Sequence, residues 1–483
     1  MKYFLGLDYR AMRLNQASPA LYDPETLING HMLISGMSGT GKSFQSLRFL
    51  TSAAKSGLTI DVFDVHEELH GIDGAVAVKY SQATGYGFNP LVLDTDKHEG
   101  GPAKQINFIV SLIKSVTPQF GVNQESVLRN LLTDVYHANG IYQDNLRSWQ
   151  RRSLSEAARR VIVEARRWSE LREFYPTLDD LMSYAMKKLQ VLKLGGDNKA
   201  ATAFEQLSKQ LKALHRARSN YSKQADPQEL EKLEVKIEDL QNKTIEAYSL
   251  FVRCQETGRE WEDLLKYESA DTLAGVIRRI ELLNSAGIFS ANEPPFGDAR
   301  VRVHQIKSLS LEQQVLFAKL RMRDIFERCK AMGPTSSGTE IRQVIFIDEA
   351  HKFFVEDGDD VINVIAKEGR KFGVAMWAAS QSPLSFPREF TTNCGATVFL
   401  GLHSSFWTGV LGKFRISEAT LKQIKPKEVL AIRLQREGEG DPEFINVAVP
   451  NPSSETGKQV LSWFSARSKG GAGRSNASSE QRQ

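Results

Sequence analysis

A glycine-rich motif near the amino terminus constrains the fold of this chain more than any other feature. The segment Gly36-Met-Ser-Gly-Thr-Gly-Lys-Ser43 matches the pattern G-x-x-x-x-G-K-[ST] at every position. It follows the apolar run His31–Ser35 and precedes a helical pattern that begins at Phe44. A strand, a glycine-rich loop and a helix in this order form a phosphate-binding P-loop, in which backbone N–H groups face a phosphate and the helix N-terminus adds positive charge.

The motif predicts binding of ATP with Mg²⁺. We expect Lys42 to reach the β- and γ-phosphates and the Ser43 hydroxyl to bind the metal ion. The other residues expected to contact the nucleotide belong to the same loop and to the first turn of the helix: Gly36, Ser38, Gly39, Thr40, Gly41 and Phe44.

A second motif supplies the acids that ATP hydrolysis requires. The run Val344–Ile347 is apolar and ends in Asp348-Glu349, which is the Walker B pattern. Asp348 would bind Mg²⁺ through water. Glu349 would orient and deprotonate the attacking water as general base. A strand that ends in two acids is weak evidence alone, but it is strong evidence beside a P-loop.

Short apolar runs alternate with helical patterns on both sides of these motifs. Near-continuous apolar strands between helices indicate a mostly parallel sheet that is covered on both faces. We therefore predict an α/β, RecA-like P-loop NTPase fold whose further strands are Thr59–Phe63, Val301–Ile306, Gln343–Ile347, Val374–Ser380 and Ala396–Leu402. Two more runs, Glu428–Leu434 and Phe444–Val449, flank a charged loop and predict an antiparallel hairpin at a sheet edge.

The middle of the chain predicts an α-helical insertion. Seven residues spaced alternately three and four apart form a heptad seam: Leu230, Leu233, Ile237, Leu240, Thr244, Ala247 and Phe251. Leu207, Leu211 and Leu214 form a shorter stripe, and Ser222–Pro227 would be the turn between two antiparallel helices. A coiled-coil-like hairpin and ordinary helices that cover the core are both compatible with this pattern.

These patterns divide the chain into five parts. Residues 1–25 are a short N-terminal segment, 26–140 the first half of the motor domain with the P-loop, and 141–270 the helical insertion. Residues 271–450 are the second half of the motor domain, with Walker B. Residues 451–483 are expected to be disordered, because they are rich in Ser, Gly, Asn and Gln.

Composition excludes several classes of protein. The net charge is +4, from 62 basic and 58 acidic residues, so any DNA site must be a local cluster of charge. The three cysteines lie far apart, which predicts neither a disulfide framework nor a zinc site. Because no stretch approaches the roughly 20 apolar residues of a membrane span, we expect a cytoplasmic protein without membrane insertion.

Three further segments resemble the HerA helicase family. The segment Asp64–Leu69 is similar to D-P-H-G-E-Y, with Asp64, His66 and Glu68 matching and with Val65 and Glu67 in place of Pro and Gly. The segments Lys367–Gly373 and Ala379–Pro383 resemble E-G-R-K-F-G and S-Q-R-P, with Ser382 in place of the arginine. FtsK-like pumps and type IV secretion ATPases share these signatures, and Phe88–Leu91 and Gly287–Phe289 resemble the secretion ATPases.

The resemblance implies a homo-oligomeric ring, a hexamer, around duplex DNA, with ATP bound between subunits. Arg370 would then be an arginine finger that a neighbouring subunit supplies, although a solvated basic face explains it too. Gln381 would sense ATP and polarise the water, or would simply be a polar strand end. We interpret His66 and Glu68 as supporting groups of the nucleotide site rather than as metal ligands, and we assign His351 no role.

The resulting functional hypothesis is an ATP-dependent DNA translocase or helicase. A nuclease or another effector in DNA end processing or anti-phage defence is a candidate partner. HerA proteins usually begin with a small β-barrel, and the segment before His31 is too short for one. Candidate DNA contacts are Lys371, Arg388 and Lys413–Arg415. The alternatives are a conjugative type IV secretion ATPase and an ATP-regulated scaffold without motor activity.

Overall fold

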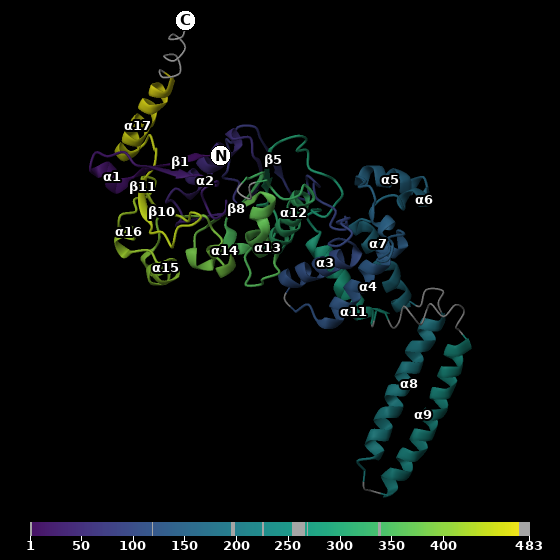
Figure 1. Ribbon diagram of the computed structural model, residues 1–483. Coiled ribbons are helices and arrows are strands. Elements are labelled where there is room, and N and C mark those ends of the chain that lie inside the picture. The colour runs from purple at the N-terminus through teal and green to yellow at the C-terminus, as the bar shows by residue number, and fades with distance from the viewer. Residues whose placement is uncertain are drawn as a thin grey trace. The chain divides into compact units, whose positions relative to one another are not determined.

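The computed structural model divides the chain into two compact units. It describes residues 2–117, 119–194, 199–224, 227–253, 266–267, 269–336 and 340–472. The first unit combines residues 1–86 with 294–483, and the second comprises residues 87–293. Figure 1 shows the strands within the first unit and helices alone in the second.

The first unit is built on one large sheet. Among the described residues, eleven strands form it in the order β2-β1-β11-β10-β9-β3-β8-β7-β4-β6-β5. Their bounds are β1 Tyr3–Asp8, β2 Pro19–Tyr22, β3 Met32–Ser35, β4 Thr59–Asp64, β5 Ala75–Lys79, β6 Val301–Gln305, β7 Gln343–Ile347, β8 Val374–Ser380, β9 Ala396–Phe399, β10 Val429–Leu434 and β11 Ile445–Ala448.

The strands from β9 to β5 pair in parallel, which confirms the predicted mostly parallel sheet. All residues of β3, β7 and β8 are buried, as expected of strands that are covered on both faces. The predicted hairpin is present as β10 and β11. It does not form the sheet edge, because β1 pairs antiparallel with β11 and β2 with β1.

Helices cover the two faces of this sheet. On one face, Phe49, Leu50 and Ala53 of α2 join the core cluster that contains Ile34 of β3 and Ile60 of β4. On the other face, the Phe317 ring of α12 contacts His304 edge-on and Tyr80 in a tilted arrangement. The helices of this unit are α1 Tyr9–Arg13, α2 Lys42–Lys55, α12 Leu311–Ala331, α13 Val361–Glu368, α14 Arg388–Thr392, α15 Trp407–Phe414, α16 Glu418–Lys422 and α17 Glu455–Ala472. Short 3₁₀ helices are η2 Ala350–Lys352, η3 Gly369–Phe372, η4 Pro383–Ser385 and η5 Ser404–Phe406.

The predicted disorder of residues 451–483 is wrong for the part that the structure describes. Helix α17 covers Glu455–Ala472, and residues 473–483 lie outside the described residues. The apolar residues Val460 and Trp463 explain the difference, since Val460 is buried against Leu7 and Ala448, and Trp463 stacks on Phe4. Composition alone hid these few anchoring side chains among polar neighbours.

The second unit is helical. Its elements are α3 Pro102–Val116, α4 Val122–Ala138, η1 Leu146–Trp149, α5 Glu156–Glu164, α6 Trp168–Leu171, α7 Leu178–Leu194, α8 Lys199–Tyr221, α9 Pro227–Arg253 and α11 Ala270–Leu283. Helix α4 packs against α3, α7 and α11. The helical region therefore begins earlier than the predicted residue 141 and ends later than residue 270. The apolar faces of α3 and α4 pack on other helices of this unit, which the periodicity of their sequences could not show.

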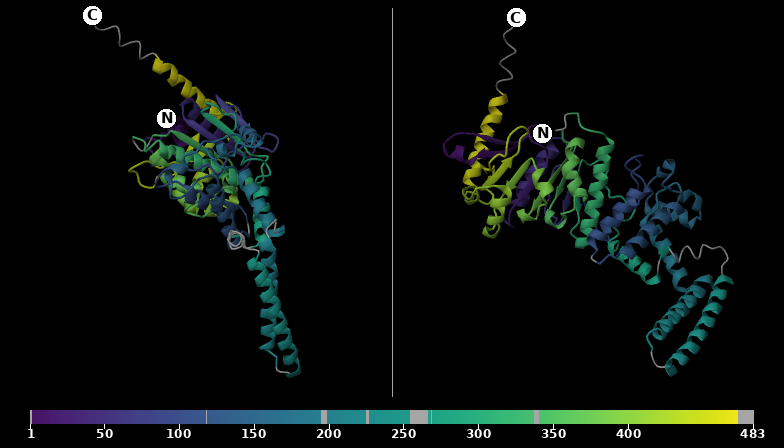
Figure 2. Two further views of the ribbon diagram at one scale, coloured as in Figure 1. Left: turned by 90° about the vertical axis from the view of Figure 1, so that its right-hand side faces the viewer. Right: turned by 60° about the horizontal axis from the view of Figure 1, so that its bottom comes forward.

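Helices α8 and α9 form an antiparallel hairpin (Figures 1 and 2). All predicted seam residues of α9 are buried or half-buried, and Ala247 and Phe251 pack against Ala203 and Leu207 of α8. The turn lies within the predicted Ser222–Pro227, of which residues 225–226 are outside the described residues. On α8, the predicted stripe is corrected at Leu211, which is 48% exposed. None of the helices formed by the described residues combines the length and the hydropathy that a membrane span requires.

A buried polar network ties β4, β6 and β7 together on the α12 side of the sheet. Asp61 accepts hydrogen bonds from Arg302 Nη2 at 2.6 Å and from Gln343 Nε2 at 3.0 Å, and its Oδ1 lies 2.9 Å from His304 Nε2. Burial alone would raise the pKa of Asp61. The hydrogen bond from His304 and the nearby arginines outweigh burial and lower that pKa well below its usual value.

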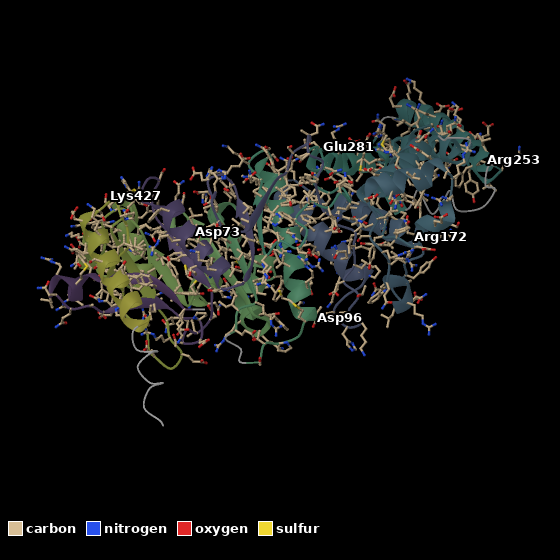
Figure 3. All side chains as sticks on the ribbon, turned by 90° about the horizontal axis from the view of Figure 1, so that it is seen from above. Asp73, Asp96, Arg172, Arg253, Glu281 and Lys427 are labelled. Carbon is tan, nitrogen blue, oxygen red and sulfur yellow. The ribbon has the colours of Figure 1, made fainter. Side chains whose placement is uncertain are left out.

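We predict that Asp61→Asn lowers the free energy of unfolding by about 3–5 kcal/mol, because it leaves buried cationic groups without their counter-charge. Urea unfolding at pH 7 measures this loss, and the exposed Asp73→Asn is the matched control (Figure 3). Since the folded-state pKa is lowered, the stabilisation is present above the ordinary Asp pKa of about 4 and is lost on acidification. An equal effect of the two substitutions at pH 7 would contradict the prediction.

Candidate functional site

The P-loop connects β3 to α2. Gly36 N–H donates to Ser380 O at 3.2 Å and Met37 N–H to Gly401 O at 2.9 Å, so the loop begins between β8 and the segment after β9. Thr40 Oγ1 donates to Met37 O at 2.7 Å and closes the turn. Ser38 and Gly39 are exposed at the crest of the loop, while Thr40 and Lys42 are buried. The crest of the loop is therefore open to solvent.

Glycine is required at two positions of this loop for different reasons. Gly41 caps α2 with a φ of 100°, a conformation that residues with a Cβ atom rarely adopt. A Cβ atom at Gly36 would lie 2.7 Å from Thr40 Oγ1 and 2.8 Å from Leu400 Cβ. The first requirement is conformational and the second is steric, and together they explain the fixed spacing of the motif.

The structure brings the P-loop lysine and the Walker B glutamate into direct contact. Lys42 Nζ lies 2.8 Å from Glu349 Oε1, and both side chains are almost fully buried. The contact arises because β3 and β7 both pair in parallel with β8, so their carboxyl ends lie at the same edge of the sheet. Switch points at this edge are the usual ligand sites of parallel α/β sheets.

Glu349 has further polar neighbours. Gln381 Nε2 donates to its Oε1 at 3.1 Å, and His351 Nδ1 lies 3.2 Å from its Oε2. Burial alone would raise the pKa of Glu349, but the Lys42 ammonium and the Gln381 amide outweigh burial and lower it. The carboxylate is therefore ionised at neutral pH. Its backbone has a φ of 48°, a left-handed conformation that is uncommon for a residue with a side chain and that often marks functional sites.

Asp348, the residue that follows β7, has a different electrostatic environment from Glu349. Burial raises its pKa to about 6, although Lys42 opposes this shift. A carboxylate that is costly to ionise in this way gains most from a nearby cation. Together with the Ser43 hydroxyl, Asp348 would offer oxygen ligands, which suit Mg²⁺. Within the described ranges, no cluster of three or more His, Cys, Asp or Glu side chains is arranged to bind a metal alone. A site with few protein ligands fits Mg²⁺ that is bound mainly through phosphates and water.

The turn after β4 brings His66 and Glu68 to the same edge. Asp64 organises it, since its carboxylate accepts hydrogen bonds from the N–H groups of residues 66–69 at 2.8–3.3 Å. Ser43 Oγ donates to Glu68 Oε2 at 2.9 Å, and His66 Nε2 lies 3.9 Å from Glu349 Oε1. Glu67 adopts a φ of 60° at the position where the resembling family has Gly. The turn geometry is thus kept without glycine.

Arg370 lies away from these residues. It belongs to η3, which precedes β8, whereas Gln381 follows β8. The strand has seven residues, so its two ends are about 23 Å apart at a rise of ~3.3 Å per residue. Arg370 Nη2 lies 3.2 Å from both carboxylate oxygens of Glu437, in the loop after β10. Arg370 is therefore at the opposite sheet edge from the P-loop of its own chain.

The candidate DNA contacts differ in their surroundings. Lys371 and Arg388 are exposed. Lys413 Nζ instead donates to the carbonyl oxygens of Leu384 and Phe386, at 3.1 and 2.5 Å, and so ties α15 to the segment after β8. Arg415 is exposed and pairs with Asp441 at 3.2 Å. All four basic side chains are exposed, but the Lys413 ammonium group is already engaged by two carbonyl oxygens.

Two residues that sequence reasoning gave no role contact the site. His351 reaches Glu349, and its Nδ1 also lies 3.2 Å from Ser380 Oγ at the end of β8. Lys427, labelled in Figure 3, donates its N–H to Thr40 O at 3.2 Å and has a φ of 62°. The position of His351 three residues after Asp348 was a usable signal. Lys427 reaches the P-loop only through the tertiary fold.

The HerA helicase central domain matches residues 12–265, which is more than half of the 483-residue chain. The chain belongs to this family. As a HerA family member it is a P-loop ATPase, and nucleotide binding follows from that membership. A search of curated proteins finds no match.

One solved structure shows the same fold. VirB4 of Thermoanaerobacter pseudethanolicus is similar with a TM-score of 0.58 at 14% identity, covering 94% of this chain and 97% of that chain. The bacterial conjugative coupling protein TrwBΔN70, in an unbound form, is similar with a TM-score of 0.45 at 12% identity, covering 93% of this chain and 92% of that chain. The likeness to VirB4 shows that this HerA family member has the RecA-like P-loop ATPase fold.

We predict that Glu349→Gln keeps ATP binding and lowers kcat by about 10²–10⁴-fold, since the amide cannot accept a proton from water. Lys42→Ala should instead abolish ATP binding, because it removes the ammonium group that faces the phosphates. Titration with a fluorescent ATP analogue and steady-state phosphate release separate the two effects. The exposed Glu356→Gln is the matched control. Native turnover by the Glu349→Gln protein would refute the assignment of the base.

His351→Ala should lower kcat about ten-fold with little change in nucleotide affinity, because it removes one of the contacts that orient Glu349. His351→Asn, which can keep a hydrogen bond to the carboxylate, should restore part of the loss. A mere packing role predicts that both variants lose thermal stability together and that their kcat values do not differ.

Proposed function

We propose that this HerA family member is an ATP-driven translocase that acts on duplex DNA as a homo-oligomeric ring. The observation that carries the proposal is the convergence of Lys42 and Glu349, with Gln381 beside them, at one sheet edge. A P-loop that only senses nucleotide needs no ionised carboxylate held next to its lysine. An arrangement with both groups is equipped for hydrolysis.

The Lys42–Glu349 ion pair suggests how the site responds to nucleotide. Phosphate oxygens that enter the P-loop compete with Glu349 for the Lys42 ammonium, since both are anionic acceptors. Lys42 then neutralises charge on the triphosphate, and Glu349 becomes available to accept a proton from water. Gln381, already within hydrogen-bond distance of Glu349, is positioned to orient that water. Ser43 and Asp348 would hold Mg²⁺, which neutralises charge that develops on the phosphates.

The position of Arg370 supports a role across a subunit boundary. It is separated from its own P-loop by the length of β8, so it cannot contact a nucleotide bound to the same chain. The Arg370 side chain is 36% exposed and its guanidinium group pairs with Glu437, so the group lies at the surface with a defined partner. A neighbouring subunit that docks its P-loop edge against this surface would receive an arginine finger. Ring formation then becomes a condition for full activity.

A conjugative type IV secretion ATPase is the second candidate. The similarity to VirB4 over nearly the full length of both chains favours it. The two functions differ in what stimulates turnover. A DNA translocase responds to duplex DNA, whereas an ATPase that moves other substrates does not need to. An ATP-regulated scaffold would bind ATP with little turnover in either case.

We expect duplex DNA to raise the ATPase rate several-fold, and we expect the stimulation to fall steeply between 50 and about 200 mM salt, because phosphate contacts release counterions. The measurement is steady-state phosphate release with and without a linear duplex, with the Lys42→Ala protein as the control for contaminating ATPase. Turnover that duplex DNA leaves unchanged would favour the secretion ATPase over the translocase.

Mixing two inactive variants tests the subunit-crossing role of Arg370. Arg370→Ala subunits keep Glu349, and Glu349→Gln subunits keep Arg370. If Arg370 acts on a neighbour, random mixing should regenerate up to about a quarter of the parent sites, at interfaces where each subunit supplies its intact residue. Phosphate release by the mixture is compared with each variant alone. A mixture no more active than its components would exclude an arginine finger supplied in trans.

A further inference from the structure

The two helices of the α8–α9 hairpin expose different surfaces outside their shared seam. Helix α8 contains no Asp or Glu from Gln206 to its end at Tyr221. Over the same stretch, and in the turn that follows, its exposed side chains form what we call the basic strip: Lys209, Lys212, His215, Arg216, Arg218 and Lys223. Among the described residues, no ion pair joins this strip to α9.

The exposed surface of helix α9 is acidic and apolar where that of α8 is basic. Between Glu231 and Val252, one side of the helix contains no Lys or Arg and forms what we call the acidic–apolar strip: Glu231, Glu234, Val235, Glu238, Ile245, Tyr248 and Val252. Arg253 follows on this side at the last residue of the helix. Ile245 is 63% exposed, Tyr248 57% and Val252 50%. The lysines of α9 lie on another side, where Lys232 pairs with Glu229 and Lys243 with Asp239 along the helix. The acids of the strip are therefore not neutralised by lysines of α9.

The two strips match in position along the hairpin. Tyr221 Oη donates to Glu234 Oε1 at 2.5 Å, which sets the register of the antiparallel helices. Both helices rise by the same distance per residue. A residue that precedes Tyr221 on α8 by a given number of positions therefore lies at the height of the residue that follows Glu234 on α9 by the same number. Arg216 lies within one residue, about 1.5 Å along the axis, of the level of Glu238, and Lys223 within one residue of the level of Glu231. Leu211, which is 48% exposed, lies within one residue of the level of Ile245.

Two hairpins from different protomers could lie side by side with their turns at the same height. The α8 strip of one and the α9 strip of the other would then match in both charge and apolar character. The basic end of the α8 strip would face the acidic end of the α9 strip, and Leu211 would face Ile245 and Tyr248. Opposite charges steer such an encounter, and the apolar contact contributes affinity. Duplex DNA fits only the basic strip, because the acidic–apolar strip would repel phosphates.

We propose that the acidic–apolar strip of α9 binds the basic strip of α8 in a second copy of this chain. The contact uses two different surfaces of each protomer and is thus heterologous, the type that closes into rings when the rotation allows. It rests on the proposed function in so far as that function requires a ring. It adds an interface that is separate from the nucleotide site.

Charge reversal in the full chain tests the contact. Arg216→Glu with Lys223→Glu reverses the basic strip, and Glu231→Lys with Glu238→Lys reverses the acidic one. Sedimentation velocity in a non-hydrolysable ATP analogue should show that each double variant raises the dissociation constant for self-association about ten-fold or more. An equimolar mixture of the two variants, and a chain with all four substitutions, should regain parent assembly. The control, Lys232→Glu with Glu229→Lys, keeps the helical ion pair and should assemble as the parent does.

Three results would overturn the contact. The first is unchanged assembly of both double variants, and the second is impaired assembly without recovery in the mixture. The third is a chain with Arg216→Glu and Lys223→Glu that assembles normally but binds a duplex oligonucleotide more weakly. That result would assign the basic strip to nucleic acid. A parent chain that stays monomeric in the analogue overturns the contact and also the ring of the proposed function. If duplex DNA stimulates turnover but the hairpin substitutions do not change assembly, the proposed contact is wrong and the proposed function is retained.

Discussion

The buried ion pair between Lys42 and Glu349 is the interaction on which the site depends. Two opposite charges in a protein interior are tolerated only when each satisfies the other, and removal of either one leaves an uncompensated charge. The pair joins the loop after β3 to the end of β7, although β8 lies between these strands in the sheet. Parallel pairing through β8 aligns the two carboxyl ends, so the position of the two groups is set by strand register.

Two acidic residues at the same edge have strained backbone conformations. Glu349 and Glu67 both have positive φ, at 48° and 60°, where glycine would be the relaxed choice. In Glu67 the strain is offset by Asp64, whose carboxylate binds the N–H groups of the turn. A relaxed glycine would widen the range of backbone conformations in these turns. Side chains at these positions instead restrict the turn, and this helps to fix His66 and Glu68 beside the P-loop.

The parallel sheet could be predicted from sequence because its strands are near-continuous apolar runs, a pattern that burial on both faces produces. The strands β1, β2 and β5 could not be predicted in this way. In β5 only one of five residues is buried, and β1 and β2 join the sheet through β11, which is distant in sequence. The Walker residues follow local motifs and could be located. The contact of Lys427 with Thr40 depends on tertiary packing, which leaves no local pattern.

The two edges of the sheet have different consequences for a single protomer. The carboxyl edge carries the lysine, the carboxylates and Gln381, whereas the amino edge carries Arg370, about 23 Å away at ~3.3 Å per strand residue. No rotamer of one side chain spans that distance, so one chain cannot complete a site that needs both edges. A second copy can, and the proposed contact between hairpin strips would involve a different part of the chain from the nucleotide site. Assembly and hydrolysis would then be coupled by geometry, since the subunit that receives the arginine also needs its neighbour held in register.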